Sequence, residues 1–420
     1  MSAQCNASHS VVPRVARRIA VCDPMQTSYR DIALLACCQA LLLVNSAGLI
    51  AMNGLVGYAL VDNKTFATLG VTSYVLGSAL AAMPAALYMA RVGRRRGFMT
   101  GSLIAIVGSA TCALGIAGSS FLLYCLGTAI VGVYTAFGLQ YRFAAAEVAA
   151  PAFKAKAISL VLAGGIVGGF IGPTAAVWAK DLLGVPFLGS FVVLSAIALI
   201  AMAVQSQVRV PAPSAAERTG DGRPLHEIAA QPVFVVAVLA AALGYGIMNL
   251  LMTATPLAMG FCGHPFNAAA FVIEWHVVGM YAPGFYTGSL IKRFGALKII
   301  VSGALLMASC VVVAVSGIAI WQFWVALVLL GMGWNFMYTG GTTLLTETYA
   351  PAEKAKTQGL NDAIVFTVMV VSSFSSGALV SAAGWEWMNL GALPFLAIVA
   401  VATLWLTWIR QHRPTAAAKG

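Results

Sequence analysis

An acid and an imidazole stand almost side by side inside a long, mostly apolar stretch of the sequence. Glu274 and His276 flank Trp275 in the segment 267–290. Burial favours the protonated form of a carboxyl, and an imidazole titrates near neutral pH, so either side chain is suited to carrying a proton. Residues two apart point about 200° away from each other on a helix. We therefore expect one of the two to face a binding site and the other to pack, with a purely structural hydrogen bond as the alternative.

A second acid, Asp362, lies beside Asn361 near the start of a predicted helix that begins at 358. Asp and Asn are common at helix starts, where the side chain accepts a hydrogen bond from a backbone N–H. We expect Asp362 to cap its helix rather than to act on a ligand.

The sequence lacks the arrangements that catalysis or nucleotide hydrolysis needs. It contains no Ser-His-Asp spacing, no paired metal ligands and no glycine-rich phosphate loop. We therefore expect neither an enzyme nor an ATP-driven pump, and no cofactor or metal. The longest polar stretch, 208–231, is too short for a signalling domain.

The elements that must position these groups are membrane helices. Of the 420 residues, 60% are apolar and 9% are charged, whereas soluble domains contain about 45–50% apolar and about 25% charged residues. A bilayer is crossed by about 20 apolar residues. Such stretches predict twelve helices, near 32–58, 66–90, 98–118, 120–142, 157–177, 187–207, 233–256, 267–290, 298–317, 321–345, 358–383 and 386–409.

The basic residues are distributed unevenly between the two sides of these helices. Of the 24 Lys and Arg residues, all but Lys64 and Lys180 fall in the tails or in the loops on the side of the tails. Basic loops remain in the cytoplasm during insertion. We expect a multi-pass protein of the cell inner membrane with both termini cytoplasmic, and no nucleic-acid partner despite the net charge of +11.

The two halves of the chain repeat one another. Segment 147–156 is EVAAPAFKAK and segment 347–356 is ETYAPAEKAK, with seven of ten positions identical. Six helices in the same orientation in each copy predict two parallel six-helix bundles. The expected divisions are a tail at 1–31, a bundle at 32–207, a cytoplasmic linker at 208–232, a bundle at 233–409 and a tail at 410–420.

These features resemble the major facilitator superfamily over nearly the whole chain. The resemblance implies an all-α, polytopic fold of two six-helix bundles, between which a solute is carried by alternating access. The superfamily's signature after the second helix of each bundle implies gating roles for Arg91, Gly93, Arg94, Gly288, Arg293 and Gly295.

The acid of that signature is missing from both copies, where Ala90 and Lys292 occupy its position. We expect Glu147 and Glu347, in the neighbouring loops, to supply the acidic partner of the cytoplasmic gate. Orientation of the loops is the alternative role of these two acids.

By the same resemblance, the first, fourth, seventh and tenth helices line a central cavity. Apart from Arg142 and Lys298, which lie at the cytoplasmic ends of the fourth and ninth helices, no predicted helix contains Lys or Arg. We expect a cavity without a fixed cation, suited to a neutral, zwitterionic or cationic solute. Amides and aromatic rings indicate a planar, hydrogen-bonding solute. The candidate contacts for substrate or protons are Asn45, Asn249, Glu274, His276, Trp334, Asn335 and Tyr338.

The segment 274–295 is similar to a subgroup of bacterial facilitators that includes riboflavin transporters. This similarity implies a secondary transporter for uptake of riboflavin or a similar planar, uncharged vitamin. Proton-coupled drug or metabolite efflux is the alternative, and a non-transport receptor fits least. We expect a monomer whose partners are the solute and the lipid bilayer, with protons as a candidate coupling ion.

Overall fold

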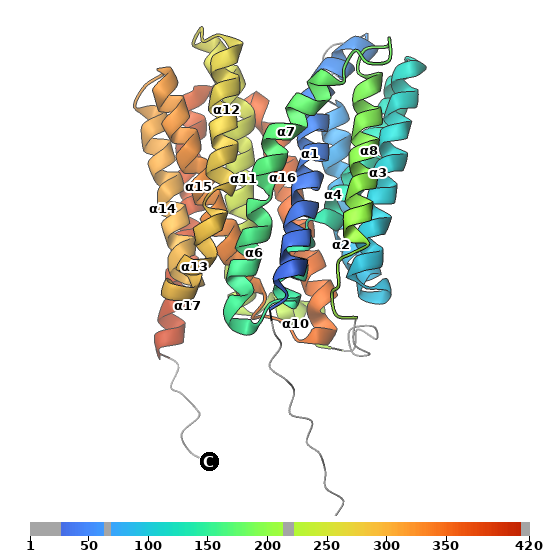
Figure 1. Cartoon of the computed structure of the whole chain (residues 1–420). Coiled ribbons are helices and arrows are strands. Elements are labelled where there is room, and N and C mark those ends of the chain that lie inside the picture. Colours follow the sequence, from blue (N-terminus) through green and yellow to red (C-terminus); the bar gives the residue numbers. More distant parts are fainter. Residues whose placement is uncertain (1–26, 63–68, 213–221, 413–420) are drawn as a thin grey trace, which may run out of the picture.

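The computed structural model describes residues 27–62, 69–212 and 222–412, and its regular elements in these ranges are helices. They form two groups that stand side by side (Figure 1). The N-terminal half contains α1 (Tyr29–Leu60), α2 (Leu69–Val92), α3 (Arg94–Ala117), α4 (Phe121–Gly138), α5 (Tyr141–Glu147), η2 (Pro151–Phe153), α6 (Lys154–Ala163), α7 (Gly165–Trp178) and α8 (Leu188–Gln205).

The C-terminal half contains an equivalent series of membrane helices, although these helices are broken at other places. It contains α11 (Pro232–Phe261), α12 (Phe266–Tyr281), α13 (Gly284–Phe294), α14 (Ala296–Val315), α15 (Ile320–Leu345), η3 (Pro351–Glu353), α16 (Lys354–Leu390) and α17 (Leu393–His412), preceded by the short α10 (Leu225–Ala229). The predicted all-α architecture of two bundles is confirmed.

Eleven helical segments of the described residues are long and apolar enough to cross a membrane. The remaining predicted helix, 267–290, is the eighth along the chain. It corresponds to α12 and α13, which are separated by a break at Pro283. Proline lacks an N–H and breaks the helical ladder. At this break the Asn335 amide donates a hydrogen bond to the carbonyl of Met280 at 2.7 Å. Within α16, Gly384 is not helical (φ 81°, ψ 171°), so the chain breaks between the predicted helices 358–383 and 386–409. The last membrane-crossing segment, Ala382–His412, combines the end of α16 with α17.

Two glycines of the repeated signature adopt the same unusual backbone conformation. Gly93 has φ 88° and ψ 158°, and Gly295 has φ 88° and ψ 153°. This region is essentially restricted to glycine. Each residue separates two helices, α2 from α3 and α13 from α14, so the equivalent turns of the two halves keep glycine because a side chain would strain them.

Helix α1 begins and α17 ends at the same end of the molecule, which we call the basal end (Figure 1). The N–H of Ser28, before α1, donates to the carbonyl of Val148 at 3.0 Å. Near the end of α17, Arg410 donates to Glu347 at 2.8 Å. Both copies of the repeated decapeptide therefore lie at the basal end, close to the start of α1 and the end of α17.

Helices from opposite halves pack against each other in four main pairs: α2 with α16, α6 with α13, α6 with α15, and α7 with α12. Glycines allow these approaches. A Cβ on Gly165 of α7 would lie 2.6 Å from the ring of Tyr281 in α12, and a Cβ on Gly288 of α13 would lie 2.6 Å from the carbonyl oxygen of Ala155. Small residues thus bring the backbones of the two halves into contact.

We expect Gly168→Val to destabilise the N-terminal half by about 1–3 kcal/mol, the usual cost of overpacking. A Cβ at this position in α7 would lie 2.5 Å from the Cβ of Leu43 in α1 and also against the backbone of Ala40. Thermal unfolding of the purified protein measures the effect. Gly260→Ala is the control, because no atom lies within 4 Å of the added Cβ. Equal melting temperatures for the two variants would contradict the assigned packing.

Candidate functional site

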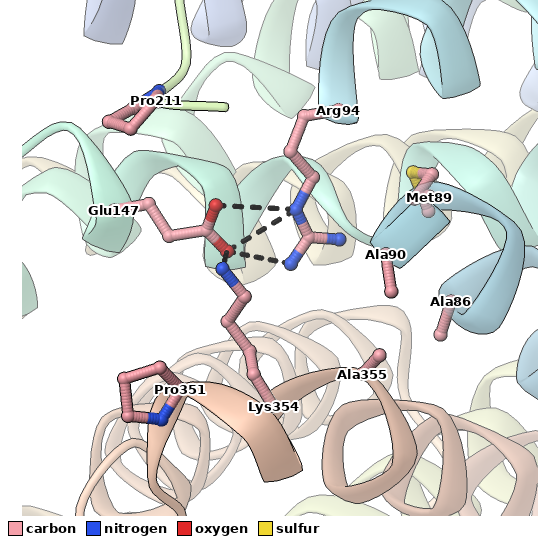
Figure 2. Close-up of a pocket in the computed structure, with 9 residues that line it drawn as sticks. All are labelled: Ala86, Met89, Ala90, Arg94, Glu147, Pro211, Pro351, Lys354 and Ala355. Carbon is pink, nitrogen blue, oxygen red and sulfur yellow. Dashed lines mark hydrogen bonds and ion pairs between the residues drawn. The ribbon is translucent and has the colours of Figure 1, made fainter. Parts of the chain in front are cut away.

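Charged side chains from both halves meet at the basal end (Figure 2). Glu147, the last residue of α5, accepts hydrogen bonds from Arg94 at 2.7 Å (Nη2) and 3.2 Å (Nε). Lys354 places its Nζ 3.4 Å from the same carboxylate. Arg94 begins α3 of the N-terminal half and Lys354 begins α16 of the C-terminal half. The carboxylate therefore ties the two halves together.

A second set of polar contacts lies next to the first. The Gln140 amide accepts from Arg94 Nη1 at 2.8 Å and donates to Asp362 at 2.7 Å. Asp362 also forms an ion pair with Arg142, and both side chains are 1% exposed. The prediction that Asp362 caps its helix was wrong. It lies more than two turns after Lys354, too far along α16 to reach the first-turn N–H groups, and it pairs with an arginine of the other half.

One face of α16 carries the C-terminal contribution to these contacts. Lys354, Gln358 and Asp362 recur at every fourth position and so lie on one side of the helix. Gln358 accepts from Arg94 Nη2 at 2.6 Å and donates to the Tyr349 hydroxyl at 2.7 Å. Burial raises the pKa of Tyr349, so its hydroxyl stays protonated and neutral. We call the whole set the gate network: Arg94, Gln140, Arg142, Glu147, Lys354, Gln358 and Asp362.

The cavity beside Glu147 and Lys354 is very small. Its volume is about 10 Å³, which is space for about one water molecule. Its other lining residues are Ala86, Met89, Ala90, Arg94, Pro211, Pro351 and Ala355 (Figure 2). An organic solute does not fit in this cavity, so the contacts of Arg94, Glu147 and Lys354 leave no room for a substrate beside them.

The predicted gating residues lie at four different places in the structure. Arg94 and Glu147 belong to the gate network, and Gly288 gives the close approach of α13 to α6, where its N–H donates to the Ser159 hydroxyl at 3.0 Å. Glu347 pairs instead with Arg410 of its own half, and both side chains are largely exposed. The remaining predicted residues, Arg91, Gly93, Arg293 and Gly295, lie in or beside the exposed turns between helices.

An aromatic cluster of the C-terminal half contacts the gate network. Trp334 and Tyr338 of α15 are stacked with ring centroids 5.1 Å apart and an interplanar angle of 15°. Tyr245 of α11 meets both rings edge to face, and Tyr281 of α12 meets Trp334 in the same way. The Arg142 guanidinium lies 4.6 Å from the centroid of Tyr338. The structure therefore places a cation at the interface between the halves, and Asp362 neutralises its charge.

Several buried polar atoms around this cluster have no hydrogen-bond partner among the described residues. They are Nε and Nη1 of Arg142, Nε1 of Trp334 and the hydroxyl of Tyr338. A buried donor without a partner costs about 1–3 kcal/mol. Such atoms are expected where a ligand or ordered water completes the bonding.

The three candidate asparagines all form hydrogen bonds within the protein. Asn335 accepts from Thr287 at 2.7 Å, in addition to its bond at the Pro283 break. Asn249 donates to the Ser372 hydroxyl at 3.0 Å and so joins α11 to α16. Asn45 donates to the Leu194 carbonyl at 3.0 Å, but its Oδ1 is buried and lacks a partner. Of the three, only Asn45 retains a buried atom with unused bonding capacity.

Glu274 and His276 point to different sides of α12, as the helical spacing requires. His276 is fully buried, and its Nδ1 lies 2.7 Å from the Leu327 carbonyl of α15. Glu274 is exposed. It lies one turn before Val277, which packs against Gly169 of the N-terminal half, so residue 274 shares the helix face that is turned toward α7.

Five members of the gate network were not among the predicted site residues: Gln140, Arg142, Lys354, Gln358 and Asp362. Lys354, Gln358 and Asp362 are spaced four residues apart, which was a usable signal. Three polar residues on one face of a membrane helix need a polar neighbour. Arg142 carried a second signal, as the one arginine within a predicted span. The sequence does not reveal that these two signals belong together.

The fold and this interface are those of a membrane transporter, and the sequence matches one transporter family. Residues 35–284 and 268–420 match the family model of the Major Facilitator Superfamily. The chain therefore belongs to that superfamily, whose members carry solutes across membranes and are not enzymes. The predicted family is confirmed.

Within the superfamily, the chain is 40% identical over 377 residues to the riboflavin transporter RfnT of Brucella anthropi, a match that covers 89% of this chain and 94% of that protein. It is 29% identical over 382 residues to the uncharacterized MFS-type transporter YddS of Bacillus subtilis, covering 86% and 87% of the two chains.

Solved structures of transporters share the fold. The crystal structure of FucP in its outward conformation aligns with a TM-score of 0.73 at 16% identity, covering 89% of this chain and 98% of that chain. The proton:xylose symporter XylE aligns with a TM-score of 0.73 at 14% identity, covering 90% and 95%. At these identities the comparison concerns the fold alone.

We expect Glu147→Gln to open the basal end more often, because the amide keeps the volume of the carboxylate but loses the charge that attracts Arg94 and Lys354. Charge-assisted hydrogen bonds contribute about 1.5–3 kcal/mol. A cysteine introduced at Ala355 should therefore react about tenfold faster or more with a water-soluble maleimide in the variant, after subtraction of the native thiols.

The matched control is Glu347→Gln, the equivalent position of the second copy. Its ion pair with Arg410 is exposed, and exposed pairs contribute little, so the labelling rate should stay at the wild-type value. Indistinguishable rates for the two glutamine variants would show that Glu147 does not hold the gate.

Proposed function

We propose that this protein is a secondary transporter that takes up riboflavin, or a closely similar planar and uncharged vitamin, across the cell inner membrane. The two halves rock about a site at their interface, which faces first one side of the membrane and then the other. The basal end, where 22 of the 24 basic residues are predicted to gather (24 less Lys64 and Lys180), faces the cytoplasm.

The aromatic cluster at the interface carries this proposal. Four rings from α11, α12 and α15 converge beside Arg142. Flat faces and nearby hydrogen-bond donors suit a fused, planar heterocycle such as the flavin ring. The 40% identity to a riboflavin transporter over most of both chains supports the same substrate.

The contacts between the halves supply the movement. The gate network holds the basal end together. The helix breaks at Gly164, between α6 and α7, and at Pro283, between α12 and α13, lie in helices that pack against the opposite half. Loss of the gate contacts would let α6 separate from α13 and α2 from α16. The site would then open to the cytoplasm.

Glu274 is the proposed proton carrier. It is exposed on the face of α12 that is turned toward α7, whereas His276 is fully enclosed within the C-terminal half. A carboxyl at that place can exchange protons with the outer side while the basal end is closed. Proton binding there would couple solute entry to the proton gradient.

We expect the protein to restore growth of a riboflavin-auxotrophic bacterium at low external riboflavin, and to transport labelled riboflavin. Trp334→Leu should raise KM about 5- to 100-fold, since stacking of a heterocycle on an aromatic side chain contributes about 1–3 kcal/mol. Trp321→Leu is the control, because Trp321 is exposed at the start of α15. Increased resistance to toxic dyes without growth rescue would favour efflux instead.

We expect Glu274→Gln to abolish accumulation driven by a pH gradient, because the amide cannot bind and release a proton. Counterflow exchange of labelled for unlabelled riboflavin should persist. Glu386→Gln, an exposed acid of the same half, should retain both activities. A glutamine variant at 274 that still responds to the gradient would rule out this role.

A further inference from the structure

We propose that Arg142 is a specificity-determining residue that recognises the hydrogen-bond-acceptor edge of a planar ring. The ligand class is an uncharged fused heterocycle that carries ring carbonyl groups, such as a pyrimidinedione. The inference rests on the proposed function for the location of the substrate site. It adds the chemistry by which one side of the ring is recognised.

The bonding of Arg142 is incomplete although the side chain is almost fully enclosed. Its side chain is 1% exposed and donates from Nη2 to Asp362. The guanidinium lies 4.5 Å from the ring centroid of Phe143 and 4.6 Å from that of Tyr338. Nε and Nη1 have no partner among the described residues. Two donor groups of a buried cation are thus available at its edge.

The other available groups point to the same ligand chemistry. A guanidinium and an indole donate hydrogen bonds and cannot accept them. Arg142 and Trp334 therefore both require acceptors, and the hydroxyl of Tyr338, whose ring contacts both side chains, can donate as well. A ligand that satisfies these atoms must present acceptors along its edge and a flat face to the stacked rings.

The charge of the site selects against anions. Asp362 neutralises the charge of Arg142 and is itself held by Gln140 and Asn361, at 2.7 Å and 2.9 Å. A carboxylate or phosphate would compete with Asp362 for the guanidinium and leave a buried acid unpaired, which is costly. Neutral carbonyl oxygens accept from the two available groups without that penalty.

The position of Arg142 also explains why a ligand would hold both halves together. Arg142 belongs to α5 of the N-terminal half, whereas Trp334 and Tyr338 belong to α15 of the C-terminal half. A ring that stacks on the aromatic cluster and bonds to Arg142 contacts both halves at once. Asp362 is then a positioning residue that fixes the guanidinium.

The test compares two probes of similar size on purified full-length protein by calorimetric titration. One is 7,8-dimethylalloxazine, a three-ring compound that carries the dione, and the other is phenazine, which has three rings and no carbonyl. The test variant combines Arg142→Met with Asp362→Asn, so that no unpaired charge is buried. We expect the affinity for the dione probe to fall about 10- to 100-fold, the effect of losing a charge-assisted hydrogen bond, and the phenazine affinity to change less than threefold.

A second variant removes one donor and keeps the ring. Trp334→Phe should reduce the affinity for the dione probe several-fold and leave phenazine unchanged. Arg96→Gln is the control, because Arg96 is exposed at the start of α3. Equal losses for the two probes in the double variant, or an unchanged ratio of affinities, would overturn the inference, because a merely structural role of Arg142 affects both ligands alike.

The outcome separates this inference from the proposed function. Riboflavin uptake by the wild-type protein, with a KM that the double variant leaves unchanged, would overturn the role of Arg142 and leave the function standing. Failure of the wild-type protein to take up riboflavin, together with Arg142-dependent binding of the dione probe, would overturn the function and support the recognition chemistry. Binding of neither probe by the wild-type protein would overturn the inference as well.

Discussion

The structure depends on one requirement, which is that charges buried between the two halves must be paired across the interface. Arg142 and Asp362 are each 1% exposed and come from opposite halves. Removing a charge from water costs several kcal/mol unless an opposite charge and further hydrogen bonds compensate it. Here the compensating charge comes from the opposite half, at the basal end where the halves meet. The same pairing that stabilises the closed state therefore defines what must change for the interface to open.

Arg142 belongs to the gate network and contacts the aromatic cluster, so the binding and gating proposed here would depend on each other. A ligand that bonds to the guanidinium changes the field at Asp362, and through Gln140 it also affects Arg94. A ligand shifts a conformational equilibrium only by its differential affinity for the two states. A shared residue supplies such a difference directly, because its bonding differs between the closed and open arrangements.

The sequence was sufficient for the fold and for part of the gate. Apolar stretches of bilayer length, the repeated decapeptide and the bias of basic residues predicted the bundles, and the missing acid of the signature led to Glu147. The sequence was insufficient where the outcome depends on which distant side chains meet. Asp362 resembled a helix cap because its helix was expected to begin near 358, whereas it begins at Lys354. The sequence also does not show that Asn335 donates to the Met280 carbonyl at the Pro283 break.

The two copies have diverged so that each supplies one part of a single gate. Arg94 corresponds to Ala296 at the offset of 202, so Glu347 has no arginine equivalent to that of Glu147 and pairs at the surface with Arg410. At the offset of 200, Arg142 corresponds to Thr342, and Asp362 to Leu162. One copy thus contributes the buried cation and the other the buried anion. A change in one copy alone leaves an unpaired buried charge, which makes the two halves interdependent despite their common architecture.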